Sequence, residues 1–417
     1  MLHAIVRSYR DAFSGLPRQV WVLATCLFVN RLGMMVLPFF ELYLTGRLGY
    51  EVEVAGRLVS LYGVGSILGV TLGGWCTDRF GAKRVQVASL VLNALGLLLL
   101  WRMRTAMGIG AVAVFVSLAS DAFRPANGAA IAAAAGPEQR ARSFSLMSLA
   151  VNLGLSLGLP LGGLLARFDF DWLFWIDAGT ALCAALFLAV HAESSAVPRR
   201  EAAAEAVAVR SPWRDGTFLV VVGLLCLTAT VLFQFFGALP VFLKHDLGFD
   251  EAGVGLALAM NTFCTAAFGM LVVRWVERRA ELRWLGVGSF LVCAGYGLDV
   301  FGTNTPLALV SILVWSVGEM FFFPLGAAFA SRRAPGQAIG RYMSTYHLGF
   351  ALAFVLAPLV GTQLYASLGP RGLWAVCLAT GVFVLFAFWL LQWRLERPAE
   401  RTPSVPDDQG ALRGGKR

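Results

Sequence analysis

Long apolar stretches, separated by short polar segments, run through almost the whole chain, and the clearest lie at 20–29, 85–101, 218–233, 307–314 and 375–391. With the glycine and alanine residues beside them, these stretches reach the ~20 residues that a helix needs to cross a bilayer. The pattern predicts twelve membrane-spanning helices, over residues 19–45, 56–77, 85–103, 109–134, 143–166, 172–192, 217–243, 252–273, 285–303, 305–331, 342–367 and 371–393.

Composition supports a membrane location. Hydrophobic residues make up 58% of the 417 residues and charged residues only 14%. A soluble globular protein carries ~25% charged residues. So few charged side chains cannot cover the water-facing surface of a chain of this length. We therefore expect an all-α polytopic membrane protein that is surrounded by lipid.

The basic residues are distributed unevenly over the predicted loops. If the N-terminus faces the cytoplasm, 25 of the 34 Lys and Arg residues lie in cytoplasmic segments and seven on the other side, while Arg31 and Arg124 fall inside helices. Cytoplasmic loops of membrane proteins carry such an excess. The pattern predicts a protein of the cytoplasmic (inner) membrane with both termini in the cytoplasm and no cleaved signal peptide. It also explains the net charge of +9 without a nucleic-acid partner.

A polar stretch rich in alanine and arginine divides the predicted helices six and six. We expect an N-terminal six-helix half at 1–192, a cytoplasmic linker at 193–216, a C-terminal six-helix half at 217–393 and a disordered cytoplasmic tail at 394–417.

The two halves resemble each other in sequence. Asp121 and Glu319 are 198 residues apart, and so are Pro160 and Pro358. Because six helices separate the halves, both enter the membrane from the same side, which makes them a parallel repeat. Substrate sites of such folds lie between the repeats near the middle of the bilayer.

Charged residues inside a membrane are costly and mark functional sites by default. Asp121, Arg124 and Arg31 lie well inside predicted helices. Asp121 and Arg124 share a helix face, and Pro125 leaves the carbonyl of Asp121 without its helical partner. This cluster suits proton or substrate handling. The alternative is an ion pair that only stabilises the helix.

Glu319 is the strongest candidate for proton coupling. It follows Trp315 and precedes Phe321, and no basic residue lies within one helical turn. A carboxyl group in such surroundings holds a proton when dry and releases it when hydrated. The alternative is a protonated glutamate that is hydrogen-bonded to a neighbouring helix for structural reasons.

Three further acidic residues lie near the outer ends of predicted helices. We expect Glu41 and Asp299 to reach the membrane interface. For Asp177 an interfacial and a functional role are equally compatible with the sequence.

Methionine, aromatic and amide side chains recur in the middle of several helices, where they predict an adaptable apolar cavity for lipophilic or amphipathic compounds. Plain packing or lipid contact is the alternative. The predicted cavity residues are Met34, Met35, Phe39, Asn127, Gln234, Phe235, Asn261, Tyr346 and His347. The cysteines and histidines are scattered, and we expect neither a metal site nor a cofactor.

The predicted loop between helices two and three carries a compact motif of glycine and charged residues. It is similar to the G-x-x-x-D-R-x-G-x-K/R-R signature of the major facilitator superfamily, and the matching residues are Gly74, Asp78, Arg79, Gly81, Lys83 and Arg84. The resemblance implies a gate that holds the two halves together on the cytoplasmic side. The alternative is a basic loop that only sets the topology.

Two more segments resemble the bacterial multidrug:proton antiporter branch of that superfamily. In helix four, Arg124 is followed by Asn127. Helix five resembles the motif G-x-x-x-G-P-x-x-G-G, with Leu159 where the family has proline, through Gly154, Gly158, Pro160, Gly162 and Gly163. The resemblance covers residues 19–393.

The resemblance implies a monomeric secondary transporter of the major facilitator fold, with twelve helices in two six-helix pseudo-repeats. With the intramembrane charges, it predicts proton-coupled efflux of lipophilic or amphipathic small molecules by alternating access. One alternative is a proton-coupled carrier of a metabolite or short peptide, and another is a membrane sensor or scaffold without transport. An enzyme is not expected, since the chain has no GxxxxGK[ST] loop and no evident nucleophile–base set.

Overall fold

A computed structural model describes residues 13–136, 139–193, 211–276, 281–333 and 339–396, and within them it contains helices and no β-strand. The first set of helices consists of α2 (Arg18–Gly33), α3 (Val36–Leu42), the π-helical turn η1 (Tyr43–Arg47), α4 (Val52–Phe80), α5 (Ala82–Arg102), α6 (Ala106–Ala134), α7 (Arg140–Phe168) and α8 (Asp171–His191). The second set consists of the short turn η2 (Pro212–Arg214), α9 (Gly216–Leu232), η3 (Phe233–Phe236), α10 (Ala238–His245), α11 (Glu251–Val276), α12 (Glu281–Gly297), η4 (Leu298–Val300), α13 (Thr305–Arg333) and α14 (Ile339–Glu396).

The described residues hold the twelve predicted membrane spans. Ten helical segments among them are long and apolar enough to cross a membrane. One of these, α14, joins two spans at Gly369, where a φ of 71° bends the chain. The apolar helix α12, of 17 residues, supplies the remaining span. Large apolar side chains such as Leu186, Phe386 and Trp389 are exposed on the outer surface, as a lipid environment requires.

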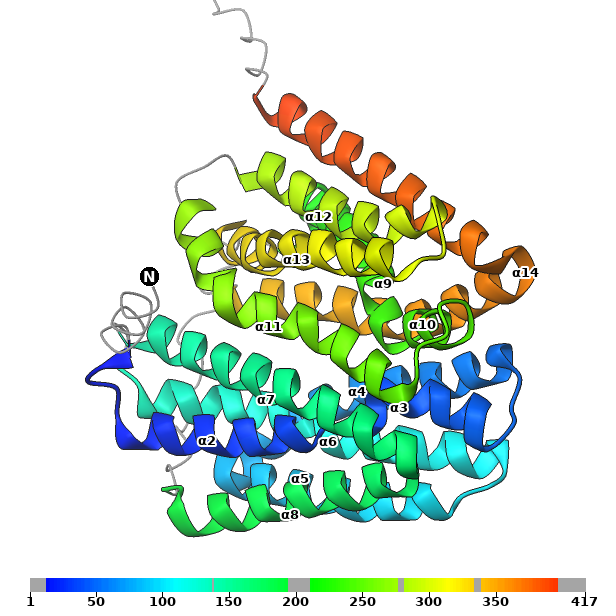
Figure 1. Ribbon diagram of the computed structural model, residues 1–417. Coiled ribbons are helices and arrows are strands. Elements are labelled where there is room, and N and C mark those ends of the chain that lie inside the picture. The colour runs from blue at the N-terminus through cyan, green and yellow to red at the C-terminus, as the bar shows by residue number, and fades with distance from the viewer. Residues whose placement is uncertain (1–12, 137–138, 194–210, 277–280, 334–338, 397–417) are drawn as a thin grey trace, which may run out of the picture.

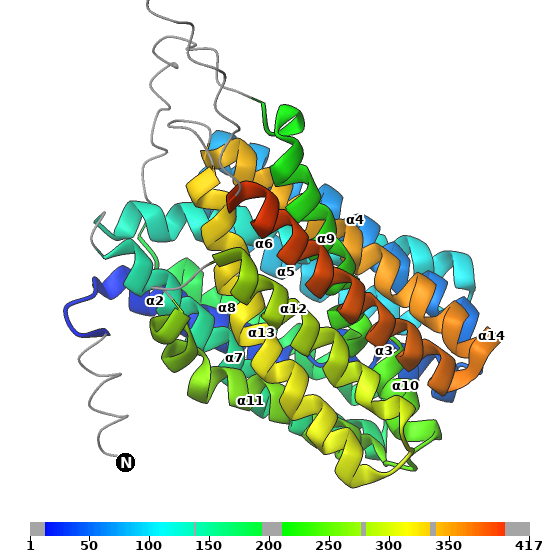
Figure 2. The same cartoon turned by 90° about the horizontal axis from the view of Figure 1, so that it is seen from above.

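The two sets form two layers that repeat each other. In Figure 1 the helices α2–α8, coloured blue to green, lie below α9–α14, coloured green to red. Both α6 and α13 have 29 residues, contain a proline and begin 199 residues apart. The layers meet where α11 packs on α7 and α14 packs on α4 (Figures 1 and 2). The two pseudo-repeats are confirmed, while the predicted linker boundaries stay a prediction because 194–210 lie outside the described residues.

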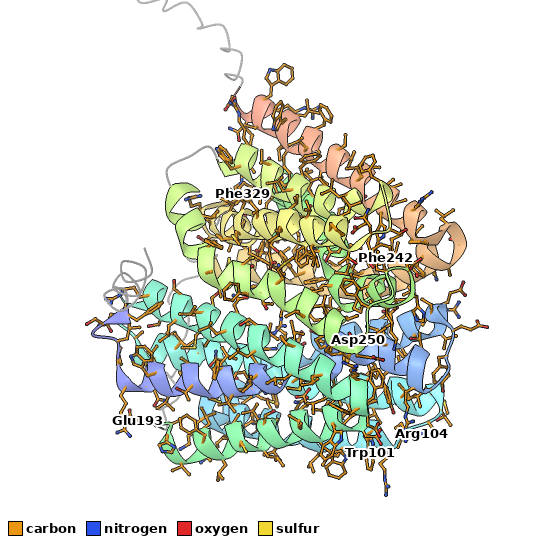
Figure 3. The ribbon with its side chains drawn as sticks, in the orientation of Figure 1. Trp101, Arg104, Glu193, Phe242, Asp250 and Phe329 are labelled. Atoms are coloured by element: carbon orange, nitrogen blue, oxygen red, sulfur yellow. The ribbon has the colours of Figure 1, made fainter. Side chains whose placement is uncertain are left out.

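The helices end at two opposite faces, which we name the termini side and the far side. The termini side holds the start of α2 and the ends of α4, α8 and α13. The far side holds the connections at 48–51, 103–105, 246–250 and 301–304. Figure 3 shows Glu193 at the termini side and Arg104 at the far side.

The prediction of continuous first and seventh helices is wrong. The first span breaks after Gly33 and resumes at Val36, and the seventh breaks between Leu232 and Ala238. The apolar pattern runs on through both breaks, because each is held by contacts with other helices. Smaller differences concern the ends of helices. The second helix, α4, begins at Val52 rather than at 56. The regular part of the ninth, α12, ends at Gly297 rather than at 303, and the last helix, at the end of α14, reaches Glu396 rather than 393. The rest of the predicted tail lies outside the described residues.

Candidate functional site

On the far side, α4 and α14 approach each other at glycine positions. A Cβ atom added at Gly56 would lie 2.1 Å from Oγ1 of Thr362, and one added at Gly63 would lie 2.8 Å from Cγ2 of Val355. Helix backbones in membranes pack closely through such small residues. The two layers are therefore closed against each other along α4 and α14 on this side.

The second far-side contact joins α7 to α11. A Cβ at Gly163 would lie 2.3 Å from the carbonyl oxygen of Glu251, and one at Gly255 would lie 2.4 Å from that of Leu159. At the rim, Arg167 forms an ion pair with Asp250 at 3.3 Å, and Figure 3 shows Asp250 where the two layers meet. These contacts complete the closure of the far side.

Towards the termini side the same helices move apart. A Cβ at Gly74 of α4 would meet no atom within 4 Å, and one at Gly269 of α11 would meet only Thr265 of its own helix. A cavity of about 350 Å³ opens between α7, α11 and α13. The structure is therefore closed on the far side and open on the termini side.

Glu319 of α13 lies in the wall of this cavity. Its Oε2 accepts a hydrogen bond of 2.7 Å from Nδ2 of Asn261, which also donates to Oγ of Ser316 at 3.0 Å. No basic side chain of the described residues forms an ion pair with Glu319. The cavity is lined by Ser145, Ser148, Leu149, Asn152, Thr265, Ala266, Gly269, Glu319, Met320, Phe323 and Pro324. One carboxyl group thus stands in a wall of mixed polar and apolar groups contributed by both layers.

The charged residues of the first set form a separate cluster. Nε of Arg124 contacts Oδ1 of Asp121 at 2.8 Å, which confirms the expected contact along one helix face. Arg31 is half-buried, and its Nε has no hydrogen-bond partner among the described residues. It borders a cavity of about 20 Å³ with Tyr62 and Asp177, large enough for about one water molecule.

Asp177 holds the break in the first span. The backbone N–H groups of Met35 and Val36 donate to its Oδ2 at 3.3 Å each. These are donors at the start of α3 that have no helical partner, and a carboxylate there also suits the helix dipole. Asp177 is buried, so the structure favours a role inside the protein over the interface.

The expectation that Glu41 and Asp299 reach the membrane interface is wrong. Each side chain is 1% exposed. Asp299 accepts a hydrogen bond of 2.9 Å from Ser311 of the neighbouring helix α13. Both residues stand at helix ends in the sequence, but in the fold other helices cover them.

The predicted cavity residues do not gather around one cavity in this conformation. Asn261 contacts Glu319, and Met34 borders the small cavity beside Arg31. The others lie elsewhere. Met35, Phe39 and Tyr346 are buried in the core, and Phe235 packs on Trp315, whereas His347 is exposed. The two amides bond to other groups: Gln234 donates to the carbonyl of Ala357 at 2.8 Å, and Asn127 accepts a hydrogen bond from Gln86. Their role in binding stays a prediction.

The polar cavity residues of α7 were not identified from the sequence. Ser145, Ser148 and Asn152 are spaced by three and four residues, which places them on one helix face. A polar stripe on an otherwise apolar helix was the signal that could have revealed them.

The signature motif lies at the open end of the molecule. Asp78 and Arg84 are exposed, and the Arg79 guanidinium lies 5.5 Å from the centre of the Trp75 ring. Gly81 has a φ of 86°, which an L side chain rarely adopts. Nζ of Lys83 donates to the carbonyl of Ala192 at 2.6 Å and so caps the end of α8.

The glycines of helix five form a packing seam for the broken first span. A Cβ at Gly154 would lie 2.8 Å from Cβ of Arg31, one at Gly158 2.4 Å from the carbonyl oxygen of Leu32, and one at Gly162 3.1 Å from Cβ of Met35. Gly163 faces the other layer, and Pro160 lies within α7 next to this seam. The motif thus joins the break, α7 and the far-side contact.

At the termini side, Asp215 ties three helices of the second set together. It caps α9 through the N–H of Phe218 at 3.1 Å and accepts hydrogen bonds from Arg333 at 2.8 Å and Tyr342 at 3.3 Å. Burial raises the pKa of this carboxyl, but the hydrogen bonds, led by that of Arg333, lower it more, so the pKa lies below its ordinary range. Asp215 therefore stabilises the fold at neutral pH, and this contribution is lost as the pH falls through the lowered pKa.

These features, two six-helix repeats around a cavity that opens to one side, define a membrane transporter fold. The model of the Major Facilitator Superfamily matches residues 23–250 and 221–416. The chain belongs to this superfamily, and it is a multi-pass secondary transporter of small molecules, as the sequence predicted.

Several curated relatives are similar over most of the chain. "Multidrug resistance protein MdtH" of Aeromonas hydrophila is 28% identical over 340 residues, which cover 80% of this chain and 84% of the relative. "Uncharacterized MFS-type transporter YttB" of Bacillus subtilis is 23% identical, with coverages of 86% and 91%. The matched region thus covers more than four fifths of the length of each of these relatives.

Solved structures support the fold. A POT family transporter in complex with 5-aminolevulinic acid has a TM-score of 0.79 at 16% identity and covers 92% of this chain and 98% of its own. The nucleoside transporter NupG has a TM-score of 0.72 at 15% identity, with coverages of 90% and 99%.

Proposed function

We propose that the protein is a proton-coupled exporter of lipophilic or amphipathic compounds and acts by alternating access. The observation that carries this proposal is the position of Glu319, an acidic group without an ion-pair partner among the described residues, in the wall of the cavity between the layers. The names of the MdtH relatives agree with such a substrate class.

The chemistry of the cavity fits a substrate with an apolar body and one cationic or donor group. Met320, Phe323 and Leu149 offer apolar surface, and Glu319 offers the negative charge. A buried carboxylate without a counter-charge is costly, so this group is stable either with a proton or with a bound cation. A proton and a cationic substrate would then compete for Glu319, which is the requirement for exchange.

The function is tested by purified protein in liposomes with an imposed pH gradient and the lipophilic cation ethidium as probe. Accumulation that follows the gradient and stops when a protonophore collapses it supports the proposal. Uptake that ignores the gradient overturns it.

The orientation belongs to the proposal as well. The excess of Lys and Arg supports a cytoplasmic termini side, and with this orientation the structure corresponds to the inward-open state in the inner membrane. A cysteine placed at Glu193 should react with a membrane-impermeant maleimide only from inside, and one placed at Thr303 only from outside. The opposite labelling, in cells whose native cysteines have been replaced, would reverse the assignment.

The signature motif acts, in this proposal, when the termini side closes. In the open structure Asp78 is exposed and forms no ion pair with the described residues of the second set. We expect Asp78→Asn to slow transport and to leave ethidium binding nearly unchanged. One charge–dipole contact at an exposed site is worth about 0.3–1 kcal/mol, so the equilibrium should shift about two- to fivefold towards the inward-open state.

Transport and ethidium binding by the Asp78→Asn protein check this prediction, with Glu193→Gln at the same face as the control. Unchanged transport would reduce the motif to a loop that sets topology.

A proton-coupled carrier of a metabolite or short peptide is the second candidate, since POT family structures share the fold. A peptide would need a cationic partner for its carboxylate. Arg31 is such a group, but it lies in the first-set cluster and does not border the cavity of Glu319. Competition of dipeptides with ethidium would favour this candidate.

We expect the protein to work as a monomer.

A further inference from the structure

The far-side contact contains a second carboxyl group, Glu41, at the point where the layers meet. It lies on α3, next to the break in the first span, and is 1% exposed. A Cβ atom at Gly237, in the matching break of the seventh span, would lie 3.5 Å from Oε2 of Glu41 and 3.4 Å from Cα of Pro358. Glu41 therefore faces the opposite layer, beside the break in the seventh span.

Neither carboxyl oxygen of Glu41 has a hydrogen-bond partner among the described residues. Oε1 of Gln234, in the same seventh-span break, is a second buried acceptor for which these residues offer no donor. The ionisable groups on the far-side half of the elements around Glu41 include Tyr43 and Arg47 of η1, Glu53 and Arg57 of α4, Arg167 of α7, Asp171 and Asp177 of α8, Lys244 and His245 of α10, and Tyr365 of α14. Lys244 pairs with Glu251, Tyr365 with Asp246 and Arg167 with Asp250.

An ionised Glu41 is incompatible with this closed contact. A buried charge that lacks both a counter-charge and hydrogen bonds costs several kcal/mol, and such a group takes up a proton instead. A protonated Glu41 is neutral, so its burial without a counter-charge no longer carries this cost. When the layers separate on the far side, water reaches the group and the charged form becomes stable.

We propose that Glu41 is a proton-binding site of the far-side contact, distinct from Glu319, and that the far side closes only when Glu41 is protonated. The proton comes from the solution on the far side and binds the carboxylate, and no other bond changes. The inference rests on the alternating access of the proposed function. It assigns to the two layers one proton site at each end: Glu319 where this structure is open and Glu41 where it is closed.

The experiment uses double electron–electron resonance spectroscopy to measure the distance between two spin labels across the far side, with the protein in nanodiscs. Spin labels replace Arg57 of α4 and Ser367 of α14, both exposed, in protein whose native cysteines have been replaced. In the parent, the ratio of closed to open molecules should rise by about tenfold for each unit that the pH falls, as expected for one linked proton. Glu41→Gln, which mimics the protonated group, should stay closed at every pH. Glu51→Gln, an exposed neighbour on the same side, should behave like the parent.

A pH dependence in Glu41→Gln equal to that of the parent overturns the inference. If Glu41→Gln is not recovered folded, Glu41→Asp decides: a shifted midpoint supports the proposal and an unchanged midpoint refutes it. Failure of ethidium transport to follow a pH gradient would refute the proposed function alone, since the far-side distance is measured without substrate or gradient.

Discussion

Glu319→Gln should abolish the accumulation of ethidium that a pH gradient drives. When no gradient is imposed, it should still exchange ethidium across the membrane at ethidium concentrations high enough to offset the lost charge. The amide has the shape of the protonated carboxyl and keeps a polar partner for Asn261, which lies 2.7 Å from Oε2. It cannot release a proton when the cavity is hydrated. We expect at least about a tenfold loss of gradient-driven accumulation, because one group that titrates carries the coupling.

The matched control for this variant is Asp121→Asn. Asp121 is the repeat counterpart of Glu319, but it is paired with Arg124 at 2.8 Å and does not border the cavity. The Asp121→Asn substitution should reduce the stability of the protein more than its proton coupling, because it leaves Arg124 without its ion-pair partner. If Glu319→Gln accumulates ethidium like the parent while Asp121→Asn does not, coupling lies in the first-set cluster of Asp121, Arg124 and Arg31.

Gly255→Ala should hold the far side open and slow transport by about tenfold or more. The added Cβ would lie 2.4 Å from the carbonyl oxygen of Leu159 on the other layer, so α7 and α11 cannot close fully. Overpacking of this kind costs about 1–3 kcal/mol, which is enough to shift a two-state equilibrium by about five- to a hundredfold. The helices within each layer are untouched, and the protein should fold.

Gly223→Ala is the control, because a Cβ at Gly223 would meet no atom within 4 Å. The distance between labels at positions 57 and 367 should lengthen in Gly255→Ala and not in Gly223→Ala. Equal distances in both variants would show that the glycine contact does not set the conformational balance.

The membrane spans and the repeat could be predicted because both depend on patterns that are visible in the sequence itself. A helix that crosses a bilayer needs an apolar run of fixed length, and the pairs of Asp121 with Glu319 and of Pro160 with Pro358 keep the register of the two halves. The family signature at Gly74–Arg84 indicated the fold class because its residues lie close together in the sequence.

The breaks in the first and seventh spans could not be predicted, because their cause is distant in sequence. Asp177 holds the start of α3 from 142 and 141 residues away, and hydropathy does not register a hydrogen bond between helices. The burial of Glu41 escaped prediction for the same reason, since the opposite layer covers it. Nor could the sequence show that Phe39 and Met35 fill the core rather than a cavity in this state.

Proton release on substrate binding tests the central claim most directly. Purified protein in weakly buffered detergent solution, mixed with saturating ethidium, should release close to one proton per molecule bound, because ethidium replaces the proton on Glu319. Glu319→Gln lacks the charge that attracts the cation, so it should bind ethidium more weakly through the apolar wall and, at concentrations that saturate it, release no proton. Glu41→Gln should release as the parent does. Equal proton release by the parent and by Glu319→Gln would contradict the assignment of Glu319 as the group that exchanges proton for substrate.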